Sequence, residues 1–154
     1  MSSYNATVPD DSLLELEHVI GYTGRYNQTA LCHPLSETTY VTALGAHIVI
    51  ADIYDPHKQI FLRGHDADVS AIHISANGRF IASGQIKSPH APAGDALIIV
   101  WDAVKQTPLY NFFGIFNEVM TVSFSPDEKF LAAAGADMNV FIWDLATGEQ
   151  VCIY

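Results

Sequence analysis

A Trp-Asp dipeptide occurs twice in this chain, each time at the end of a short apolar segment. Val100-Trp101-Asp102 closes one segment, and Ile142-Trp143-Asp144 closes the other. A short polar turn and another apolar run follow each copy. A pattern that returns after about forty residues indicates a repeated structural unit, which cannot bury its apolar face alone and must stack on its neighbours.

Short apolar runs separated by turn residues fill the chain from Leu13 onward. Asn77-Gly78, Pro126-Asp127 and Thr147-Gly148 have the chemistry of tight reversals. Many short strands with regular turn signals are typical of an all-β fold, and no segment has the pattern of a long amphipathic helix. The pattern predicts strands at Leu14–Ile20, Gln28–His33, Thr38–Ala43, Ala46–Ala51, Gln59–Leu62, Val69–Ser75, Arg79–Ser83, Ala96–Asp102, Pro108–Phe112, Val119–Ser125, Lys129–Ala134, Asn139–Asp144 and Gln150–Tyr154.

The repeated unit has the signature of a blade in a WD-repeat (WD40) β-propeller, because its length is about forty residues and it ends in Trp-Asp. A degenerate copy, Ala51-Asp52, stands where the dipeptide is expected in the first unit. Propellers close with roughly four to eight blades, so three units predict the N-terminal part of a larger propeller. The predicted repeats lie near 14–52, 59–102 and 108–144, with the start of the next at 150–154.

Composition narrows the class of function. Seven Lys and Arg residues stand against seventeen Asp and Glu residues, for a net charge of −10. This balance disfavours nucleic acid and membrane surfaces as partners, since both require clustered cations. Residues 1–12 contain no basic residue and predict a flexible tail before a propeller at 13–154, not a signal peptide. The sequence therefore predicts an intracellular protein in which Cys32 and Cys152 are reduced, buried thiols.

Four residues of the middle unit stand where WD blades carry a hydrogen-bond network. A serine, a histidine and an aspartate also suggest a catalytic triad, but a triad needs an exposed nucleophile beside an oxyanion hole. A structural role is favoured, because buried polar groups must be paired and a satisfied network stiffens its surroundings. The predicted network consists of His65, Ser83, Asp95 and Trp101.

The last unit keeps only Asp137 and Trp143 of this set. Ile115 replaces the histidine, and Ala133 replaces the serine. We therefore expect the network of this unit to be broken, and its rigidity to come from packing.

No recognisable catalytic or metal-binding motif remains. Histidines recur along the chain and Cys32 precedes His33, but no pair has the spacing of zinc ligands. Gly21-x-x-Gly24 lacks the third glycine and the Gly-Lys-Ser/Thr of a phosphate-binding loop. The sequence predicts no metal, no cofactor and no enzymatic activity.

An insertion distinguishes the middle unit. Trp101 follows Ser83 by 18 residues, whereas Trp143 follows Ala133 by 10, so the middle unit is eight residues longer, and the excess lies in Ile86–Gly94. Two prolines and a glycine argue against a strand there, and insertions in repeat proteins often lie on a binding face. The insertion is either a tolerated surface loop or a partner contact. The candidate contact residues are Ile86, Lys87, Ser88, Pro89, His90 and Pro92, on the face that carries Arg63–Asp68 and Ile115–Glu118.

The insertion and its flanks resemble two related groups of WD-repeat proteins. Ser83-Gly84-Gln85, the Pro- and Gly-rich loop and Ile98-Ile99-Val100-Trp101-Asp102 resemble both the cilia- and flagella-associated WD-repeat proteins and the echinoderm-microtubule-associated-protein-like family. The opening Leu14–Tyr22 and Leu31-Cys32-His33-Pro34 resemble the ciliary group more closely.

The resemblance to the ciliary group implies a protein with two seven-bladed propellers on the lumenal wall of the axonemal doublet microtubule. This chain would supply the first three blades, in the cytoskeleton of a cilium or flagellum. Its partners would be tubulin and neighbouring microtubule inner proteins, without enzymatic activity. The alternative is a soluble WD40 scaffold for protein partners, including a cytoplasmic microtubule-associated protein.

Overall fold

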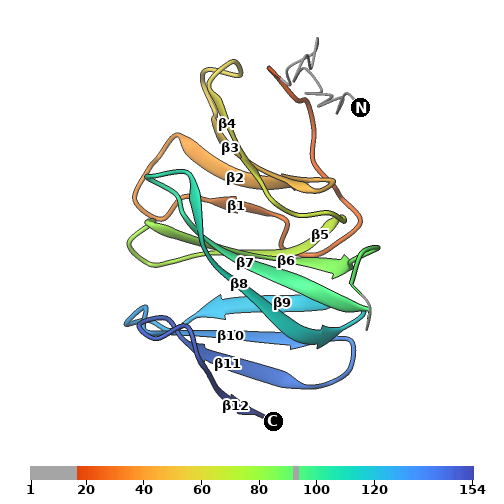
Figure 1. Cartoon of the computed structure of the whole chain (residues 1–154). Coiled ribbons are helices and arrows are strands. Elements are labelled where there is room, and N and C mark those ends of the chain that lie inside the picture. The colour runs from red at the N-terminus through yellow and green to blue at the C-terminus, as the bar shows by residue number, and fades with distance from the viewer. Residues whose placement is uncertain (1–16, 92–93) are drawn as a thin grey trace, which may run out of the picture.

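The computed structural model describes residues 17–91 and 94–154, so the predicted tail at 1–12 lies outside the described residues. Within this part of the chain, twelve strands form three four-stranded antiparallel sheets that stack one on the next (Figure 1). The prediction of an all-β fold is confirmed. The strands are β1 (Ala30–Cys32), β2 (Thr39–Leu44), β3 (His47–Asp52) and β4 (Gln59–Arg63) in the first sheet, β5 (Val69–Ile74), β6 (Phe80–Lys87), β7 (Asp95–Asp102) and β8 (Thr107–Phe116) in the second, and β9 (Val119–Phe124), β10 (Phe130–Gly135), β11 (Val140–Asp144) and β12 (Gln150–Ile153) in the third.

The boundaries of the sheets are offset by one strand from the boundaries of the sequence repeats. β4 opens the repeat at 59–102 but pairs with β3 of the first sheet, where Leu62 lies opposite Ile48. β8 opens the repeat at 108–144 but pairs with β7 of the second sheet, where Tyr110 lies opposite Val100. Each of these repeats therefore supplies the last strand of one sheet and the first three strands of the next, which links neighbouring sheets through the chain.

The predicted first strand, Leu14–Ile20, is wrong over its described part, because residues 17–20 form no strand. The Gln59 side chain engages this segment instead. The Val19 amide donates to Gln59 Oε1 at 2.9 Å, and Gln59 Nε2 donates to the Val19 carbonyl at 2.9 Å. The Gln59 side-chain amide thus makes the two hydrogen bonds to Val19 that a neighbouring strand would make to a residue of a β-strand.

The cysteine prediction is wrong as far as burial is concerned. Cys32 and Cys152 are both free, but Cys32 is exposed and Cys152 is half-buried. Each lies on an edge strand of its sheet, β1 or β12, where one side of the strand has no neighbour in the same sheet.

No helix among the described residues is long and apolar enough to cross a bilayer.

An aspartate ends β3, β7 and β11 in the same way, which confirms Ala51-Asp52 as a degenerate copy of the Trp-Asp dipeptide. In each case Oδ1 accepts the backbone amides two and three residues further on. The amide of Tyr54 lowers the pKa of Asp52, and the amide of Lys105 lowers that of Asp102. The aspartate of the dipeptide therefore stabilises the turn that follows. The three aspartates are Asp52, Asp102 and Asp144.

Two apolar cores lie between the sheets. Val41 and Ile48 of the first sheet pack with Ile72 and Trp101 of the second. The second core joins residues of the second and third sheets, among them Ile98, Ile115, Leu131 and Trp143. Because the second sheet is covered on both faces, most residues of β6 and β7 are buried.

The second and third sheets approach closely at Gly84. A Cβ atom built on Gly84 would overlap the side chain of Val119, which is fully buried at the start of β9. Nearby, Ser70 Oγ donates to the Val119 carbonyl at 2.7 Å, so β9 is also held by a hydrogen bond and has little room to shift.

We expect Gly84→Ala to lower the free energy of unfolding by about 1 to 3 kcal/mol, the usual cost of overpacking a filled core. Urea denaturation of the purified protein measures this change. Gly24→Ala is the matched control, because the added Cβ would meet nothing nearer than 3.7 Å and the backbone φ is ordinary. Equal stability of the two variants would contradict the close packing described here.

Candidate functional site

Three predicted residues form a buried chain of hydrogen bonds in the second sheet. Trp101 Nε1 donates to Ser83 Oγ at 2.7 Å, and Ser83 Oγ lies 2.7 Å from His65 Nε2. Their exposed fractions are 1% for Trp101, 0% for Ser83 and 8% for His65. These hydrogen bonds connect β7 and β6 to the segment between β4 and β5, so they fix the loop that joins the first two sheets.

Gln85 stands where the sequence predicted Asp95. His65 Nδ1 lies 2.6 Å from Gln85 Oε1, and among the described residues no hydrogen bond joins the Asp95 side chain to His65. The insertion accounts for this correction, because it lengthens β6 to Lys87 and places Asp95 at the beginning of β7, opposite Phe116.

The partners fix the direction of every bond. Gln85 Oε1 can only accept, so His65 carries its proton on Nδ1 and accepts the Ser83 hydroxyl at Nε2. Gln85 Nε2 then donates to Asp66 Oδ1 at 2.5 Å, and Ser88 Oγ donates to Asp66 Oδ2 at 2.5 Å. The network therefore runs from the core at Trp101 out to the exposed Asp66, which also binds the buried Ser88.

This network has no place for a catalytic nucleophile. Ser83 is fully buried, and its hydroxyl is held between Trp101 and His65. Burial lowers the pKa of His65 to about 4, which keeps the ring neutral near pH 7. Within residues 17–91 and 94–154, His, Cys, Asp and Glu side chains form no group of three that could hold a metal ion.

A pH dependence follows from the buried His65. Its pKa is about 4 in the folded protein and near 6.5 when exposed, so the folded state resists protonation. The stabilisation is complete above about pH 6.5 and is lost as the pH falls towards 4, by up to roughly 3 kcal/mol. Urea denaturation between pH 7 and 4 measures the loss, and His65→Gln should show a shallower dependence. Identical pH profiles would contradict the assignment.

The third sheet does not bring Asp137 and Trp143 into one network. The Asp137 carboxylate accepts the backbone amide of Asn139 at 3.2 Å and its side-chain amide at 3.0 Å, within one turn. Trp143 stacks instead on Phe112, with ring centroids 4.9 Å apart, and on Phe141, 5.8 Å away. Aromatic packing occupies the space around this tryptophan.

The predicted contact loop is partly strand. Ile86 and Lys87 belong to β6, and Lys87 pairs with Ala96 across the sheet, which corrects the expectation that this segment excludes a strand. The prolines and glycine that argued against a strand all follow Lys87. Ser88 is buried, whereas Pro89 and His90 are exposed. Pro92 lies outside the described residues.

The three loops predicted to share one face do meet. The Ile86 amide donates to the Asp68 carbonyl at 2.9 Å, and Ile86 forms an isolated bridge with Glu118. The Asn117 amide donates to the Gly94 carbonyl at 3.1 Å. In Figure 1 these segments lie at the right-hand end of the second sheet.

A surface cavity of about 290 Å³ lies beside this loop. Asp66, Ser88 and His90 line its polar side, and Leu97 and Phe113 line its apolar side. Phe113 is 53% exposed. Asp66 lies in the predicted segment Arg63–Asp68, and Gln85 lies in Ser83-Gly84-Gln85, but neither was predicted to join the network. Phe113 was not predicted at all; its one signal was the consecutive Phe112-Phe113, in which a strand must turn one ring outward. The loop and this cavity form the candidate contact face.

Comparison with known proteins agrees with the fold. The sequence matches the family described as "WD domain, G-beta repeat" over residues 56–102 and 106–144, and the chain belongs to this WD-repeat family. A solved structure titled "Structure of U3-55K" superposes with a TM-score of 0.69 over 86% of this chain and 40% of that one, at 22% identity. The predicted WD40 β-propeller architecture is confirmed.

Curated relatives show which group of WD-repeat proteins this chain resembles. The chain is 36% identical to "Cilia- and flagella-associated protein 52" of Chlamydomonas reinhardtii and 33% identical to its Homo sapiens counterpart, over 90% of this chain in each case. It is 26% identical to "WD repeat-containing protein 90" of Mus musculus over 88% of this chain. The predicted resemblance to the ciliary group is confirmed. The chain spans only 22% of the length of the two ciliary relatives.

Proposed function

We propose that this protein is a non-catalytic WD-repeat scaffold of the cilium or flagellum. Its specific role is that of a structural microtubule inner protein, which binds the lumenal wall of axonemal doublets and stabilises tubulin and neighbouring inner proteins. The observation that carries the proposal is the 36% identity to cilia- and flagella-associated protein 52 over nine-tenths of this chain.

The geometry supports a scaffold. Of the exposed residues of the candidate contact face, His90 donates its backbone amide to Ser88 Oγ at 3.1 Å, and Phe113 stands on β8, which pairs with β7. Ser88 connects the loop to Asp66, and Asp66 connects through Gln85 to His65. Because a pre-organised loop loses little conformational entropy on binding, this face suits a stable, long-lived contact.

We also propose that the three sheets are consecutive blades of one closed propeller, at 13–154 of this chain, with 1–12 as a tail before it. The outward face of the third sheet supports this arrangement. Phe130, Ala132, Ile142 and Val151 line an apolar hollow of about 400 Å³ there. A further blade packed on this face would remove that apolar surface from water.

A soluble scaffold with other protein partners is the second candidate. The net charge of −10 favours it, because tubulin is also acidic and long-range repulsion opposes the encounter. An affinity purification rich in signalling or degradation machinery, without tubulin, would support the soluble scaffold. Local cations such as Arg25, Lys58, Arg63 and Lys87 would have to offset the repulsion on a microtubule.

Fractionation of cilia tests the inner-protein role. The tagged protein should stay with axonemes through detergent and high-salt washes, and leave only when the doublets themselves are disrupted. A double variant, Lys87→Glu with His90→Ala, should be retained less well, whereas Lys129→Glu, in the exposed turn before β10, serves as the matched control. Recovery of the wild-type protein wholly in the detergent-soluble fraction would refute the role.

A further inference from the structure

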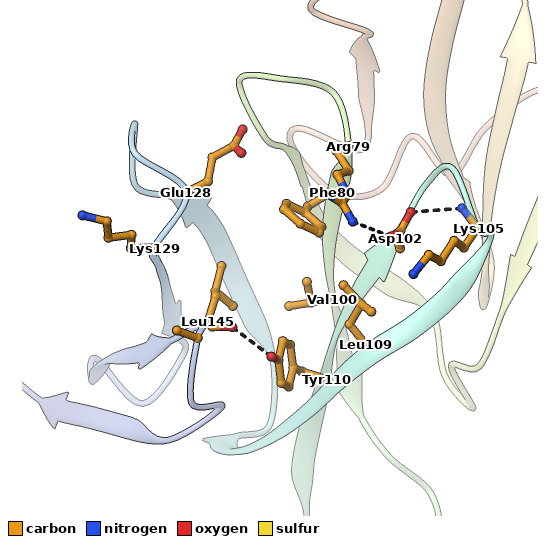
Figure 2. A pocket seen from close by; sticks show the side chains of 11 residues that line it. Arg79, Phe80, Val100, Asp102, Lys105, Leu109, Tyr110, Glu128, Lys129 and Leu145 are labelled. Atoms are coloured by element: carbon orange, nitrogen blue, oxygen red, sulfur yellow. Dashed lines mark hydrogen bonds and ion pairs between the residues drawn. The ribbon is translucent and has the colours of Figure 1, made fainter.

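A second surface pocket lies between the second and third sheets, at the opposite end of their strands from the contact loop. β6 begins at Phe80 in this pocket and ends at Lys87 beside the loop, roughly 23 Å away at the usual rise of a strand. The pocket has a volume of about 310 Å³. Figure 2 shows its apolar floor, which consists of Phe80, Val100, Leu109, Tyr110 and Leu145.

The two sheets are joined at the pocket, so it is a fixed feature of their interface. Tyr110 Oη donates to the Leu145 carbonyl at 2.8 Å across the floor. At the rim, the Asn77 turn of the second sheet binds Glu128 of the third through its backbone amide, at 2.9 Å, and through its side chain.

The pocket lining carries three cations, Arg79, Lys105 and Lys129, against two carboxylates, so its net charge is positive, in contrast to the chain as a whole. Asp102 is 1% exposed, and its carboxylate is occupied by Arg79 at 3.4 Å and by the amides of Val104 and Lys105. Both oxygens of Glu128 are held by Asn77. The acids at this rim are therefore already satisfied by internal partners.

The cationic side chains at the rim of the pocket can still bind a carboxylate of a ligand. Arg79 is fixed by Asp102 and by the Phe80 ring, 5.1 Å from its guanidinium, while its side chain is 54% exposed. Within the described part of the chain, Lys105 forms no salt bridge, and Figure 2 shows its side chain reaching towards the floor. Lys129 also lines the rim, with a solvent-exposed partner, Asp127, at 3.4 Å. Exposed pairs of that kind contribute little and exchange readily.

We propose that this pocket binds an acidic peptide segment of a partner protein through one large apolar side chain. The volume is at the lower limit for a ligand site, which suits a single anchoring residue. The floor would bury that residue, and carboxylates on either side of it would pair with Arg79 and Lys105. The site is distinct from the contact loop, so its failure would leave the proposed function untouched.

Binding of a synthetic peptide tests the proposal. The probe is a short fluorescent peptide of aspartate and glutamate with one central phenylalanine, titrated against the purified protein by fluorescence anisotropy. We expect saturable binding that weakens with added salt, since exposed charges are screened. Lys105→Glu should weaken binding about tenfold through like-charge repulsion, and Leu109→Ser should weaken it through loss of the apolar floor.

A control variant and a control peptide distinguish binding at this pocket from non-specific electrostatic attraction. Lys58→Glu should bind the peptide as the wild type does, because Lys58 is on the first sheet and pairs with Asp52 there at 3.7 Å. A peptide with serine in place of phenylalanine should bind much more weakly. Lys105 and Leu109 are exposed, so both variants should unfold at the wild-type urea concentration. Absence of binding, equal affinity for the serine peptide, or an unchanged affinity in Lys105→Glu would overturn the proposal.

Discussion

Replacing Trp101 with alanine is expected to lower the free energy of unfolding by about 3 to 5 kcal/mol, the range for removing a large buried aromatic side chain. Trp101 is 1% exposed and packs in the core between the first two sheets. The substitution also removes the indole donor to Ser83. Urea denaturation followed by circular dichroism measures the loss.

A pair of conservative variants separates packing from hydrogen bonding in that result. Trp101→Phe loses the donor to Ser83 as well as some volume, whereas Trp143→Phe loses volume in a stack formed with Phe112 and Phe141. We expect Trp101→Phe to cost roughly 1 kcal/mol more than Trp143→Phe, the net value of one buried hydrogen bond. Equal costs would show that the network adds nothing beyond packing.

Ser83→Ala is the second large prediction. The Ser83 hydroxyl is the only described group that bonds both His65 Nε2 and Trp101 Nε1, and its removal leaves two buried polar atoms unpaired. Each unpaired group costs about 1 to 3 kcal/mol, so we expect a loss of roughly 2 to 4 kcal/mol from a change of one oxygen atom.

Ser123→Ala provides the control for Ser83→Ala. Ser123 is exposed, and its hydroxyl makes one long contact, at 3.4 Å, with the carbonyl of Phe124. Its removal should change stability by no more than about 0.5 kcal/mol. A loss below 1 kcal/mol for Ser83→Ala would mean that water or a rearranged neighbour pairs the two nitrogens.

The strand pattern of this chain was predictable because its signals are local. Turn pairs such as Asn77-Gly78 and Pro126-Asp127 interrupt alternating apolar runs, and the strands between them fall close to where that pattern placed them. The repeat also revealed Asp52 as an equivalent of Asp102 and Asp144 without a tryptophan before it. Local turn chemistry was sufficient there, since each aspartate bonds only the next few amides.

The network was harder to predict because its last member depends on the insertion. Gln85 reaches His65 from the extended end of β6, and nothing in the spacing showed that β6 would continue to Lys87. The apolar pocket was not predictable either. Its floor combines Phe80, Tyr110 and Leu145 from two sheets, and the positive rim lies in a chain whose overall charge is strongly negative.

Electron cryomicroscopy of isolated doublet microtubules, at a resolution that separates β-strands, tests the proposed function most directly. We expect density on the lumenal wall into which the three sheets fit as consecutive blades, with the His90 and Phe113 face against a neighbouring protein. The same density should be missing from doublets of a strain that lacks the protein. Lumenal walls that are identical in the two strains, with the protein recovered only from the soluble fraction, would contradict it.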